Sequence, residues 1–320
     1  MKLSNPQSLF ICMGSGGVVQ ELENVGIRAR FASVTVLKSI HEDIQALLDE
    51  GALDRGLHNE YHSVFACAIP TTFSEAKSII VAAVPSPPIK LVFNHHGRSF
   101  EAFLPPTYAD AKEVDDKVLA TMRKCDQSAR IERAYLPVKT LASRTGVILY
   151  GRNNIGYVPE RGSYHRLTAF LTDIEVEGTS WRDKEMLPAC KTCRKCLEAC
   201  PNHVIMEDRF LIRAERCLTY LNEKPSDHPF PDWVRKEAHN ALVGCMICQR
   251  VCPYDKDALG DIKEGVAFSE KETSLLLGEF NDESLGASVD DKLGKVGLDR
   301  TIFPRNLKVL IESGRPNPRD

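Results

Sequence analysis

The sequence predicts an α+β domain followed by a small cysteine-rich domain. Helical and strand patterns are mixed before residue 180, and eight of the 11 cysteines lie between Cys190 and Cys252. With 320 residues, of which 43% are hydrophobic, the chain is long enough for about two hydrophobic cores. We therefore expect three regions: residues 1–180, residues 181–260, and a C-terminal helical segment and tail over residues 261–320.

Local patterns predict the elements of the first domain. The segment from Val34 to Leu48 has apolar residues at helical spacing and ends near Gly51, which indicates an amphipathic helix. The segment from Ser78 to Val84 is short and rich in apolar and β-branched residues, which favours a buried strand.

A hairpin and a second helix are expected next. Two strand-like runs, Ile89 to Phe93 and Ser99 to Leu104, flank the turn sequence Asn94-His-His-Gly97. Two histidines in a turn can ligate a metal, although solvated turn residues are the commoner arrangement. The segment from Tyr108 to Lys124 is helical in pattern, with acidic residues in its early turns.

A polar, glycine-rich loop from Tyr150 to His165 precedes the more apolar segment from Leu167 to Asp173. Its backbone N–H groups, asparagines, serine and histidine suit a large polar cofactor, while an elaborate connection is the alternative. The glycines between Met13 and Val19 do not fit G-x-G-x-x-G, so no nucleotide site is predicted there.

The first cysteine run has the spacing of a bacterial ferredoxin. It reads Cys190-Lys-Thr-Cys193-Arg-Lys-Cys196-Leu-Glu-Ala-Cys200-Pro201, which is C-x2-C-x2-C-x3-C-P. In that motif the fourth cysteine binds the neighbouring cluster, so the run predicts a partner motif further along the chain.

The partner run is Cys245-Met-Ile-Cys248-Gln-Arg-Val-Cys252-Pro253, which lacks a cysteine at its start, where Leu242 stands. Cys217 is the only other cysteine between the two runs, and we infer that it completes the set. One [4Fe-4S] cluster is therefore assigned to Cys190, Cys193, Cys196 and Cys252. The other is assigned to Cys200, Cys217, Cys245 and Cys248.

Structural zinc is the alternative for eight cysteines, but zinc sites usually pair two-cysteine knuckles and do not explain two x3-Cys-Pro endings. A disulfide framework is typical of small secreted chains, and this chain is long. The remaining cysteines, Cys12, Cys67 and Cys125, are interpreted as small buried residues.

Composition limits the remaining classes. A net charge of −3 and a pI near 6.3 give no global reason to expect a polyanionic partner, and do not exclude a local basic face. The apolar stretches are shorter than the roughly 20 residues that cross a bilayer, and the N-terminus lacks the pattern of a signal peptide. We therefore expect a cytoplasmic protein without membrane contact.

Several segments carry a resemblance to a known family. They are Tyr150-Gly-Arg-Asn-Asn154, Gly162-Ser163, Leu171-Thr-Asp173, the first cysteine run, Arg216-Cys-Leu-Thr-Tyr-Leu221, and Gly244-Cys-Met-Ile-Cys-Gln-Arg-Val-Cys-Pro253. From about Arg133 to Cys252 the sequence resembles the epoxyqueuosine reductases, cobalamin-dependent iron-sulfur enzymes related to reductive dehalogenases. The use of Cys217 in place of a cysteine at position 242 is similar to that family's pattern.

The resemblance implies a base-off cobalamin held between a nitroreductase-like α+β domain and a ferredoxin-like domain. Electrons from an external donor such as ferredoxin or flavodoxin would pass through the clusters to cobalt. Nitroreductase-like folds also accept flavin, which leaves the cofactor of the first domain open. The cofactor-binding residues implied are Gly151, Arg152, Asn153, Asn154, Gly162, Ser163, His165, Thr172 and Asp173.

The sequence departs from the family in two places. The family's catalytic aspartate lies in an R-Y-A-x-G-x-D-Y-H stretch, where this chain has Pro105-Pro-Thr-Tyr108-Ala-Asp110. Asp110 or Tyr108 is the candidate proton donor, and capping of the following helix is the alternative role. Members usually carry a C-terminal helical-repeat extension associated with tRNA, whereas this sequence ends soon after the helical pattern from Arg305 to Ile311.

Two functions are therefore expected. The first is a cobalamin-dependent reductase acting on epoxyqueuosine in tRNA or on a smaller electrophile. The second is an electron-transfer or corrinoid-reducing protein whose clusters serve a partner.

Overall fold

The computed structural model describes residues 14–108, 110–176, 178–208, 210–256 and 261–313. It divides into two compact units, neither of which is continuous in sequence. The first unit comprises Met1–Pro85 and Lys112–Thr192, and the second comprises Ser86–Ala111 and Cys193–Asp320. These units differ from the predicted boundaries at residues 180 and 260, because the hairpin after residue 85 joins the C-terminal half.

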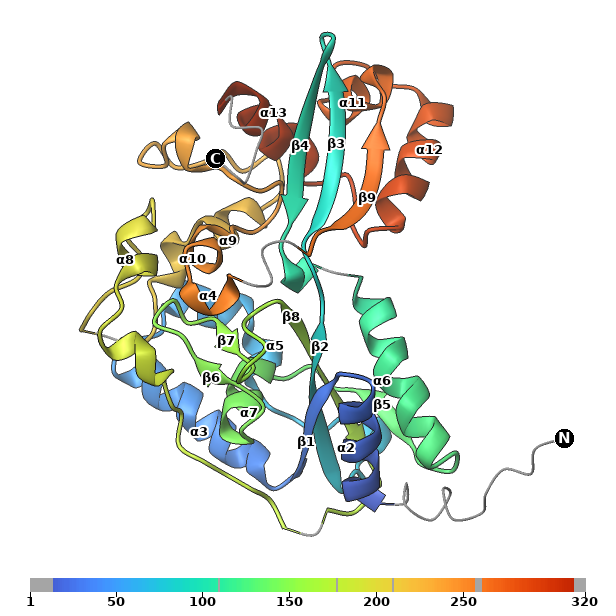
Figure 1. Cartoon of the computed structure of the whole chain (residues 1–320), viewed down its shortest axis with the longest axis vertical. Helices are drawn as coiled ribbons and strands as arrows, with labels where there is room; N and C mark the ends of the chain where they lie inside the picture. Colours follow the sequence, from blue (N-terminus) through green and yellow to red (C-terminus); the bar gives the residue numbers. More distant parts are fainter. Residues whose placement is uncertain (1–13, 109, 177, 209, 257–260, 314–320) are drawn as a thin grey trace, which may run out of the picture. The chain divides into compact units, whose positions relative to one another are not determined.

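The first unit is built on a four-stranded sheet whose paired neighbours are all antiparallel (Figure 1). In spatial order the strands are β1 (Arg28–Ser33), β2 (Ser78–Pro85), β8 (His165–Thr172) and β5 (Ile131–Arg133). Strand β2 is buried on both of its faces, as its run of apolar and β-branched residues predicts. An antiparallel sheet with separate helices agrees with the predicted α+β class.

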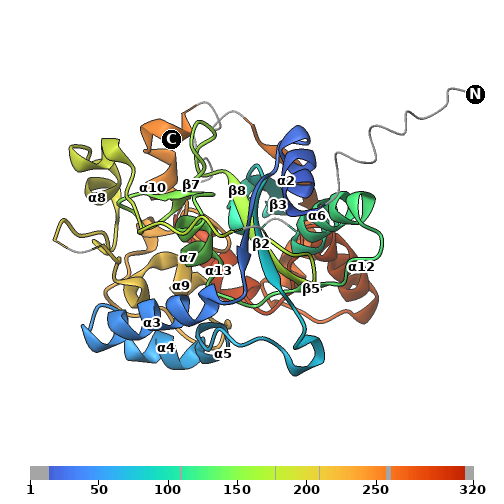
Figure 2. The ribbon, with the colours of Figure 1, turned by 90° about the horizontal axis from the view of Figure 1, so that it is seen from below.

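Helices cover both faces of this sheet, as the views in Figures 1 and 2 agree. Helices α2 (Gly14–Asn24) and α6 (Ala111–Cys125) lie on one face, and α3 (Val36–Asp49) and α7 (Val138–Arg144) on the other. The apolar stripe of α3 packs with alternate residues of β2, which confirms the predicted amphipathic helix. The shorter elements of this unit are α4 (Arg55–Glu60), α5 (His62–Phe65), β6 (Leu149–Tyr150) and β7 (Gly156–Tyr157).

The second unit contains a three-stranded sheet in the order β4-β3-β9. The hairpin of β3 (Ile89–His95) and β4 (Arg98–Leu104) confirms the sequence prediction. Its turn residues His96 and Gly97 both have positive φ, at 47° and 68°, as a two-residue type I′ turn requires. Strand β9 (Lys263–Phe268) pairs with β3 in parallel, and no local pattern predicted it.

The histidines of this hairpin do not share one environment. His96 is exposed, as expected for a turn residue. His95 is buried instead, with its Nε2 atom 3.6 Å from a carboxylate oxygen of Glu279. The prediction of two solvated histidines is therefore wrong for His95, because it occupies the last paired position of β3.

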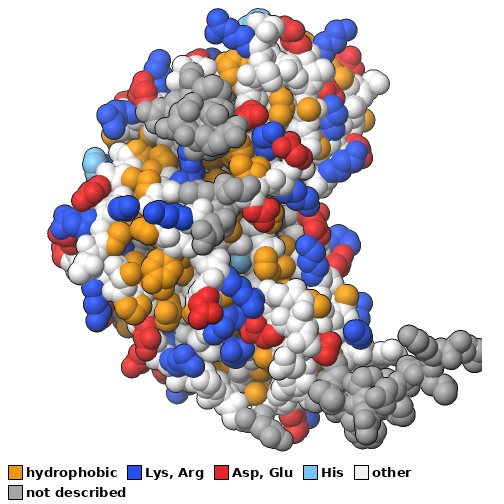
Figure 3. Space-filling view, in the orientation of Figure 1, with side chains coloured by type: hydrophobic (Ala, Val, Ile, Leu, Met, Phe, Trp, Pro, Cys, Tyr) orange, Lys and Arg blue, Asp and Glu red, His pale blue; other side chains and the backbone are white. Residues whose placement is uncertain are grey.

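Helices α11 (Glu270–Leu276), α12 (Glu283–Gly294) and α13 (Phe303–Ser313) pack on this sheet and form its core. The cysteine region contains only short helices: α8 (Lys195–Ala199), α9 (Leu218–Asn222) and α10 (Ile247–Arg250). Among the residues described, no helix has both the length and the apolar character needed to cross a membrane. On the face shown in Figure 3, acidic and basic side chains are intermixed.

Candidate functional site

Four cysteine side chains from three short segments gather in the second unit. Cys200 follows α8 and Cys217 precedes α9, while Cys245 precedes α10 and Cys248 lies within it. Cys200 belongs to one small apolar cluster, against which Cys217, Cys248 and also Cys196 pack. Cys200, Cys217, Cys245 and Cys248 are the four residues that the sequence assigns to the second cluster, whereas Cys196 is assigned to the first.

Burial controls the chemistry of these thiols. It raises the pKa of Cys245 to about 12 and the pKa of Cys248 well above its usual value, and neighbouring cysteines raise both further. Burial raises the pKa of Cys217 as well. Desolvated thiols ionise readily only beside a cation. The donor set therefore fits an iron-sulfur cluster, whose irons bind thiolates.

Amide side chains hold the segments that carry these cysteines. Asn240 Nδ2 donates to Cys245 Sγ at 3.2 Å, and Asn240 Oδ1 accepts from the backbone N–H of Met246. Asn222 Nδ2 donates to the carbonyl of Gly244 at 2.8 Å. Asn306, on α13, donates to the carbonyls of Asn222 and Leu242 at 2.7 and 2.8 Å. Sequence reasoning missed these residues, because an isolated asparagine carries no motif.

The backbone before Cys245 requires glycine. Gly244 has a φ of 72°, and a Cβ atom there would lie 2.5 Å from Tyr108 Cε2. Any side chain at this position would strain the backbone and displace Tyr108. The predicted catalytic residue Tyr108 is thus packed against the segment that carries the cysteine.

The other four cysteines lie on segments of both units. Cys190 lies in a 3-10 turn (Pro188–Lys191), and Arg152 donates to its backbone carbonyl within the first unit. Cys193, Cys196 and Cys252 belong to the second unit. The assignment of these four cysteines to one cluster stays a prediction. Among the described residues, no three His, Cys, Asp or Glu side chains converge as ligands of a single metal ion.

The polar loop from residue 150 to residue 165 is ordered by its own contacts. Strands β6 and β7 pair across it, and Val158 and Gly162 close a tight turn through backbone hydrogen bonds. Gly151 has no room for a side chain, because a Cβ atom would lie 2.5 Å from both Asn153 Oδ1 and Tyr157 Cε2. Asn153 is buried and donates to the Tyr157 hydroxyl at 3.0 Å.

Asn154 carries the clearest sign of a missing partner in this loop. Its φ is 58°, and Lys139 Nζ donates to both its backbone carbonyl and its Oδ1 atom, at 2.8 and 2.6 Å. Its Nδ2 atom is buried and has no hydrogen-bond partner among the described residues. A buried amide N–H without an acceptor is costly, so this atom suits a ligand that accepts a hydrogen bond.

His165 stands at the start of β8, close to Gly162 and Ser163. Burial lowers the pKa of His165 to about 4, against the opposing effect of a hydrogen bond to the backbone of Gly162. The imidazole is therefore neutral at neutral pH. Ser163 is buried beside it.

Thr172 and Asp173 lie elsewhere. Thr172 ends β8, seven residues after His165 and roughly 23 Å along an extended strand, and Asp173 follows it. Thr172 is paired with Ser78 in the sheet, and Asp173 Oδ1 accepts from the backbone N–H of Arg130 at 3.0 Å. The structure does not bring these two residues to the loop that carries the other predicted cofactor residues.

The two candidate proton donors lie before α6. The Tyr108 hydroxyl donates to the carboxylate of Glu223, at the end of α9. The backbone of Asp110 packs against Gly297, where a Cβ atom would lie 3.3 Å from the Asp110 Cα. The predicted helix begins at Ala111, so Tyr108 lies in a 3-10 turn rather than in the helix. The catalytic role of both residues stays a prediction.

The class of the cysteine region follows from these features and from one family match. Residues 189–255 match the family described as the 4Fe-4S double cluster binding domain. The chain therefore carries an iron-sulfur domain for two clusters, and the zinc alternative is not supported.

Sequence relatives match a stretch of the chain that is longer than this domain. The chain is 32% identical over 126 residues to an epoxyqueuosine reductase of Bacillus subtilis, a match that covers 39% of this chain and 31% of the relative. It is 31% identical over 118 residues to one of Atelocyanobacterium thalassa, covering 37% of each. The matches span about a third of the length of these curated relatives.

Solved structures share the fold over a greater length. The epoxyqueuosine reductase from Streptococcus thermophilus superposes with a TM-score of 0.61 at 20% identity, covering 92% of this chain and 80% of that chain. An epoxyqueuosine reductase solved with a modified tRNA-Tyr stem loop gives a TM-score of 0.62 at 20% identity. The chain is thus similar to epoxyqueuosine reductases, as its motifs indicate.

Proposed function

We propose that this protein is a cobalamin-dependent iron-sulfur reductase that acts on an electrophilic substrate of the epoxyqueuosine class. The observation that carries the proposal is the group of four desolvated thiols at Cys200, Cys217, Cys245 and Cys248, of which Cys200 is buried and the others are half-buried, within a double cluster binding domain. Cys217 completes the ligand set of the second cluster. An ordinary ferredoxin repeat needs no such additional cysteine from outside its two motifs. An external donor such as ferredoxin or flavodoxin supplies the electrons.

The loop in the first unit supplies the residues that would hold the cofactor. The orphaned Nδ2 atom of Asn154 and the neutral imidazole of His165 offer hydrogen bonds without adding charge. Gly162 has a φ of 75°, which favours glycine and keeps the backbone of this turn free of a side chain. When bound, cobalamin supplies a strongly reducing cobalt centre. The role of this chain is to position the cofactor and to exclude water.

Proton supply is assigned to the segment before α6. Tyr108 donates to Glu223. Once the phenol has given its proton to the substrate, this carboxylate can take up a proton from solvent and pass it to the phenol oxygen. Asp110 is the alternative donor. Replacement of Tyr108 by Phe and of Asp110 by Asn separates them, since only the true donor loses turnover while iron and corrinoid contents are unchanged. If neither variant loses turnover, this assignment is contradicted.

The substrate is proposed as epoxyqueuosine, in tRNA or as a smaller compound with the same electrophilic centre. The shared fold supports this class, and one solved relative contains an epoxyqueuosine-modified tRNA stem loop. Restoration of queuosine in tRNA of a reductase-deficient strain tests the tRNA form. Failure of the intact holoprotein to restore it would favour the smaller compound.

Cofactor retention tests the enzyme class. Purified protein is incubated with cobalamin, desalted, and assayed for corrinoid and iron. We expect stoichiometric corrinoid in the wild type, less in Asn154→Ala, and no change in Asn281→Ala, which alters an exposed asparagine of the second unit. Intact clusters without retained corrinoid would instead identify an electron-transfer protein. Retained flavin in the extracted protein would reassign the cofactor.

A further inference from the structure

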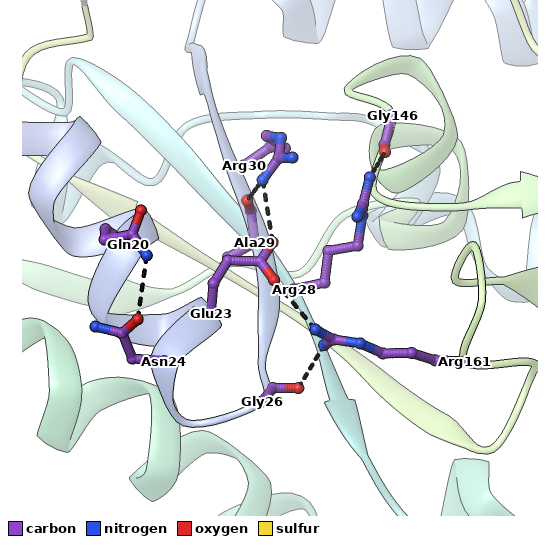
Figure 4. A network of polar contacts seen from close by, with 9 residues as sticks. All are labelled: Gln20, Glu23, Asn24, Gly26, Arg28, Ala29, Arg30, Gly146 and Arg161. Carbon is purple, nitrogen blue, oxygen red and sulfur yellow. Dashed lines mark hydrogen bonds and ion pairs between the residues drawn. The ribbon is translucent and has the colours of Figure 1, made fainter.

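Arginine side chains gather around a single carboxylate in the first unit. Arg28 and Arg30 lie two residues apart on β1 and so point to the same side of the sheet. Arg161 reaches the same place from the turn before β8, and Figure 4 shows Glu23 of α2 between Arg30 and Arg161. None of these residues belongs to the cofactor or cysteine sets described above.

Two of these arginines have structural partners. Arg30 Nη1 is 3.3 Å from Glu23 Oε1 and donates to the carbonyl of Ala29 at 2.6 Å. Arg161 is 3.4 Å from Glu23 Oε2 and donates to the carbonyl of Gly26 at 2.7 Å. One carboxylate thus serves both side chains, and together they fix the turn between α2 and β1.

Arg28 and Arg182 are different, because both lie at Gly146 without a carboxylate. Arg28 Nη2 contacts the Gly146 carbonyl at 3.4 Å, and its Nε atom is buried without a partner among the described residues. The Arg182 guanidinium also packs against this glycine, because a Cβ atom on Gly146 would lie 2.9 Å from Arg182 Cζ. Within the described part of the chain, neither arginine has an acidic side chain within ion-pair distance.

The local charge is strongly unbalanced. The surroundings of Arg28 contain Arg30, Arg161 and Arg182 but only one carboxylate, Glu23. Burial lowers the pKa of Arg28, and repulsion from the three other arginines lowers it further. A group of like charges at a half-buried position is unfavourable unless an anion joins it.

We propose that Arg28 and Arg182 form a binding site for a phosphate group, beside Gly146. Two guanidinium groups can each donate a pair of hydrogen bonds, and a phosphate has enough oxygens to accept both pairs. The phosphate is carried by a small ligand or by a nucleic-acid backbone, whose oxyanions have the same chemistry. The site is independent of the reductase activity proposed above, because it shares no residue with it.

Equilibrium dialysis of the full-length protein against radiolabelled inorganic phosphate at constant ionic strength tests the site. We expect saturable binding by the wild type that is weakened about tenfold in Arg182→Gln, as the loss of a charge-assisted pair of bonds implies. Arg28→Gln should show a similar loss. Both variants are checked for unchanged iron content, which separates this test from that of the reductase.

Lys38→Gln is the matched control, because it removes one positive charge from an exposed side chain of the same unit. It should bind phosphate as the wild type does. If Lys38→Gln and Arg182→Gln weaken phosphate binding equally, the effect comes from the overall charge of the protein and the proposal is overturned.

A short oligoribonucleotide distinguishes the two sources of phosphate. Binding of inorganic phosphate that the oligonucleotide does not displace indicates a free phosphate or a small phosphorylated ligand. Arg182-dependent binding of the oligonucleotide, with weak binding of free phosphate, indicates a nucleic-acid backbone. Absence of binding by both probes overturns the site.

Discussion

The sheet of the first unit and the cysteine region of the second unit are held together by different forces. In the sheet, Ile79, Ile80 and Val81 are completely buried between helices. The cysteine region has short helices, and its small apolar cluster has only Cys200, Val204 and Ile205 as fully buried members. Burial of apolar surface should therefore dominate the stability of the first region, whereas the second is expected to depend on its iron-sulfur clusters and on the hydrogen bonds of Asn222, Asn240 and Asn306.

Removal of the iron should have the largest effect and should act on one region only. The protein has two tryptophans, Trp181 packed against the core of the first unit and Trp233 in the second unit beside Arg216. Trp233 is 43% exposed and lies beneath the Arg216 guanidinium, so its fluorescence should change after chelation of the iron as that contact is lost, while Trp181 should not change. Variants that keep only one of the two tryptophans show which residue gives each fluorescence change. Simultaneous changes at both residues would show that the regions do not differ as described.

Replacement of Ile79 by Ala should destabilise the first unit by about 2 to 5 kcal/mol, because it opens a cavity in a completely buried site. Urea unfolding followed through Trp181 measures this loss. Iron content per chain should stay at the wild-type value in the absence of denaturant. A loss of iron in this variant would contradict the separation of the two regions.

Replacement of Asn306 by Leu should weaken the cysteine region by about 2 to 4 kcal/mol, because the buried carbonyls of Asn222 and Leu242 lose their donor. We expect faster loss of iron to a chelator and an unchanged unfolding curve for Trp181. Asn281→Leu, which changes an exposed asparagine, is the control. Equal rates of iron loss in both variants would contradict the claim that Asn306 stabilises the cysteine region.

A smaller effect is expected from pH in the first unit. Burial lowers the pKa of His165 from 6.5 to about 4, so the unfolded chain binds more protons than the folded chain between these values. Stability should therefore be constant above about pH 6.5 and should fall as the pH is lowered toward 4. Urea unfolding followed through Trp181 at pH 7 and pH 5 measures this. His165→Gln should reduce the difference, and an unchanged difference would contradict a desolvated neutral imidazole at this half-buried position.

Local patterns predicted the elements whose residues carry a strong periodicity. Helix α3, strand β2 and the β3–β4 hairpin were expected at nearly their observed positions. Strand β9 was missed, because its sequence Lys-Glu-Gly-Val-Ala-Phe is largely exposed and its pairing partner lies far away in the chain. The grouping of Ser86–Ala111 with the C-terminal half was also not predicted, because it rests on contacts between segments that are far apart in the sequence.

The candidate site was predictable to a similar degree. The spacing of the cysteines follows from cluster chemistry, and the matched double cluster binding domain confirms the iron-sulfur class. The division of the cysteines between the two clusters stays a prediction, since Cys196 packs beside Cys200, Cys217 and Cys248. The supporting residues Asn240 and Asn306 were not found, since they act through contacts that sequence spacing does not encode. Asp173 had looked similar to a cofactor residue, yet its carboxylate binds the backbone of Arg130.

Iron and sulfide analysis of Cys217→Ser tests the central claim most directly, with Cys67→Ala as the control. Cys67 is a buried cysteine of the first unit that lies outside both cysteine runs. If Cys217 completes the second cluster, its replacement should remove about half of the iron, because each [4Fe-4S] cluster needs four thiolates, while Cys67→Ala should keep the wild-type content. Full iron content in Cys217→Ser would contradict the assignment of Cys217 as a ligand.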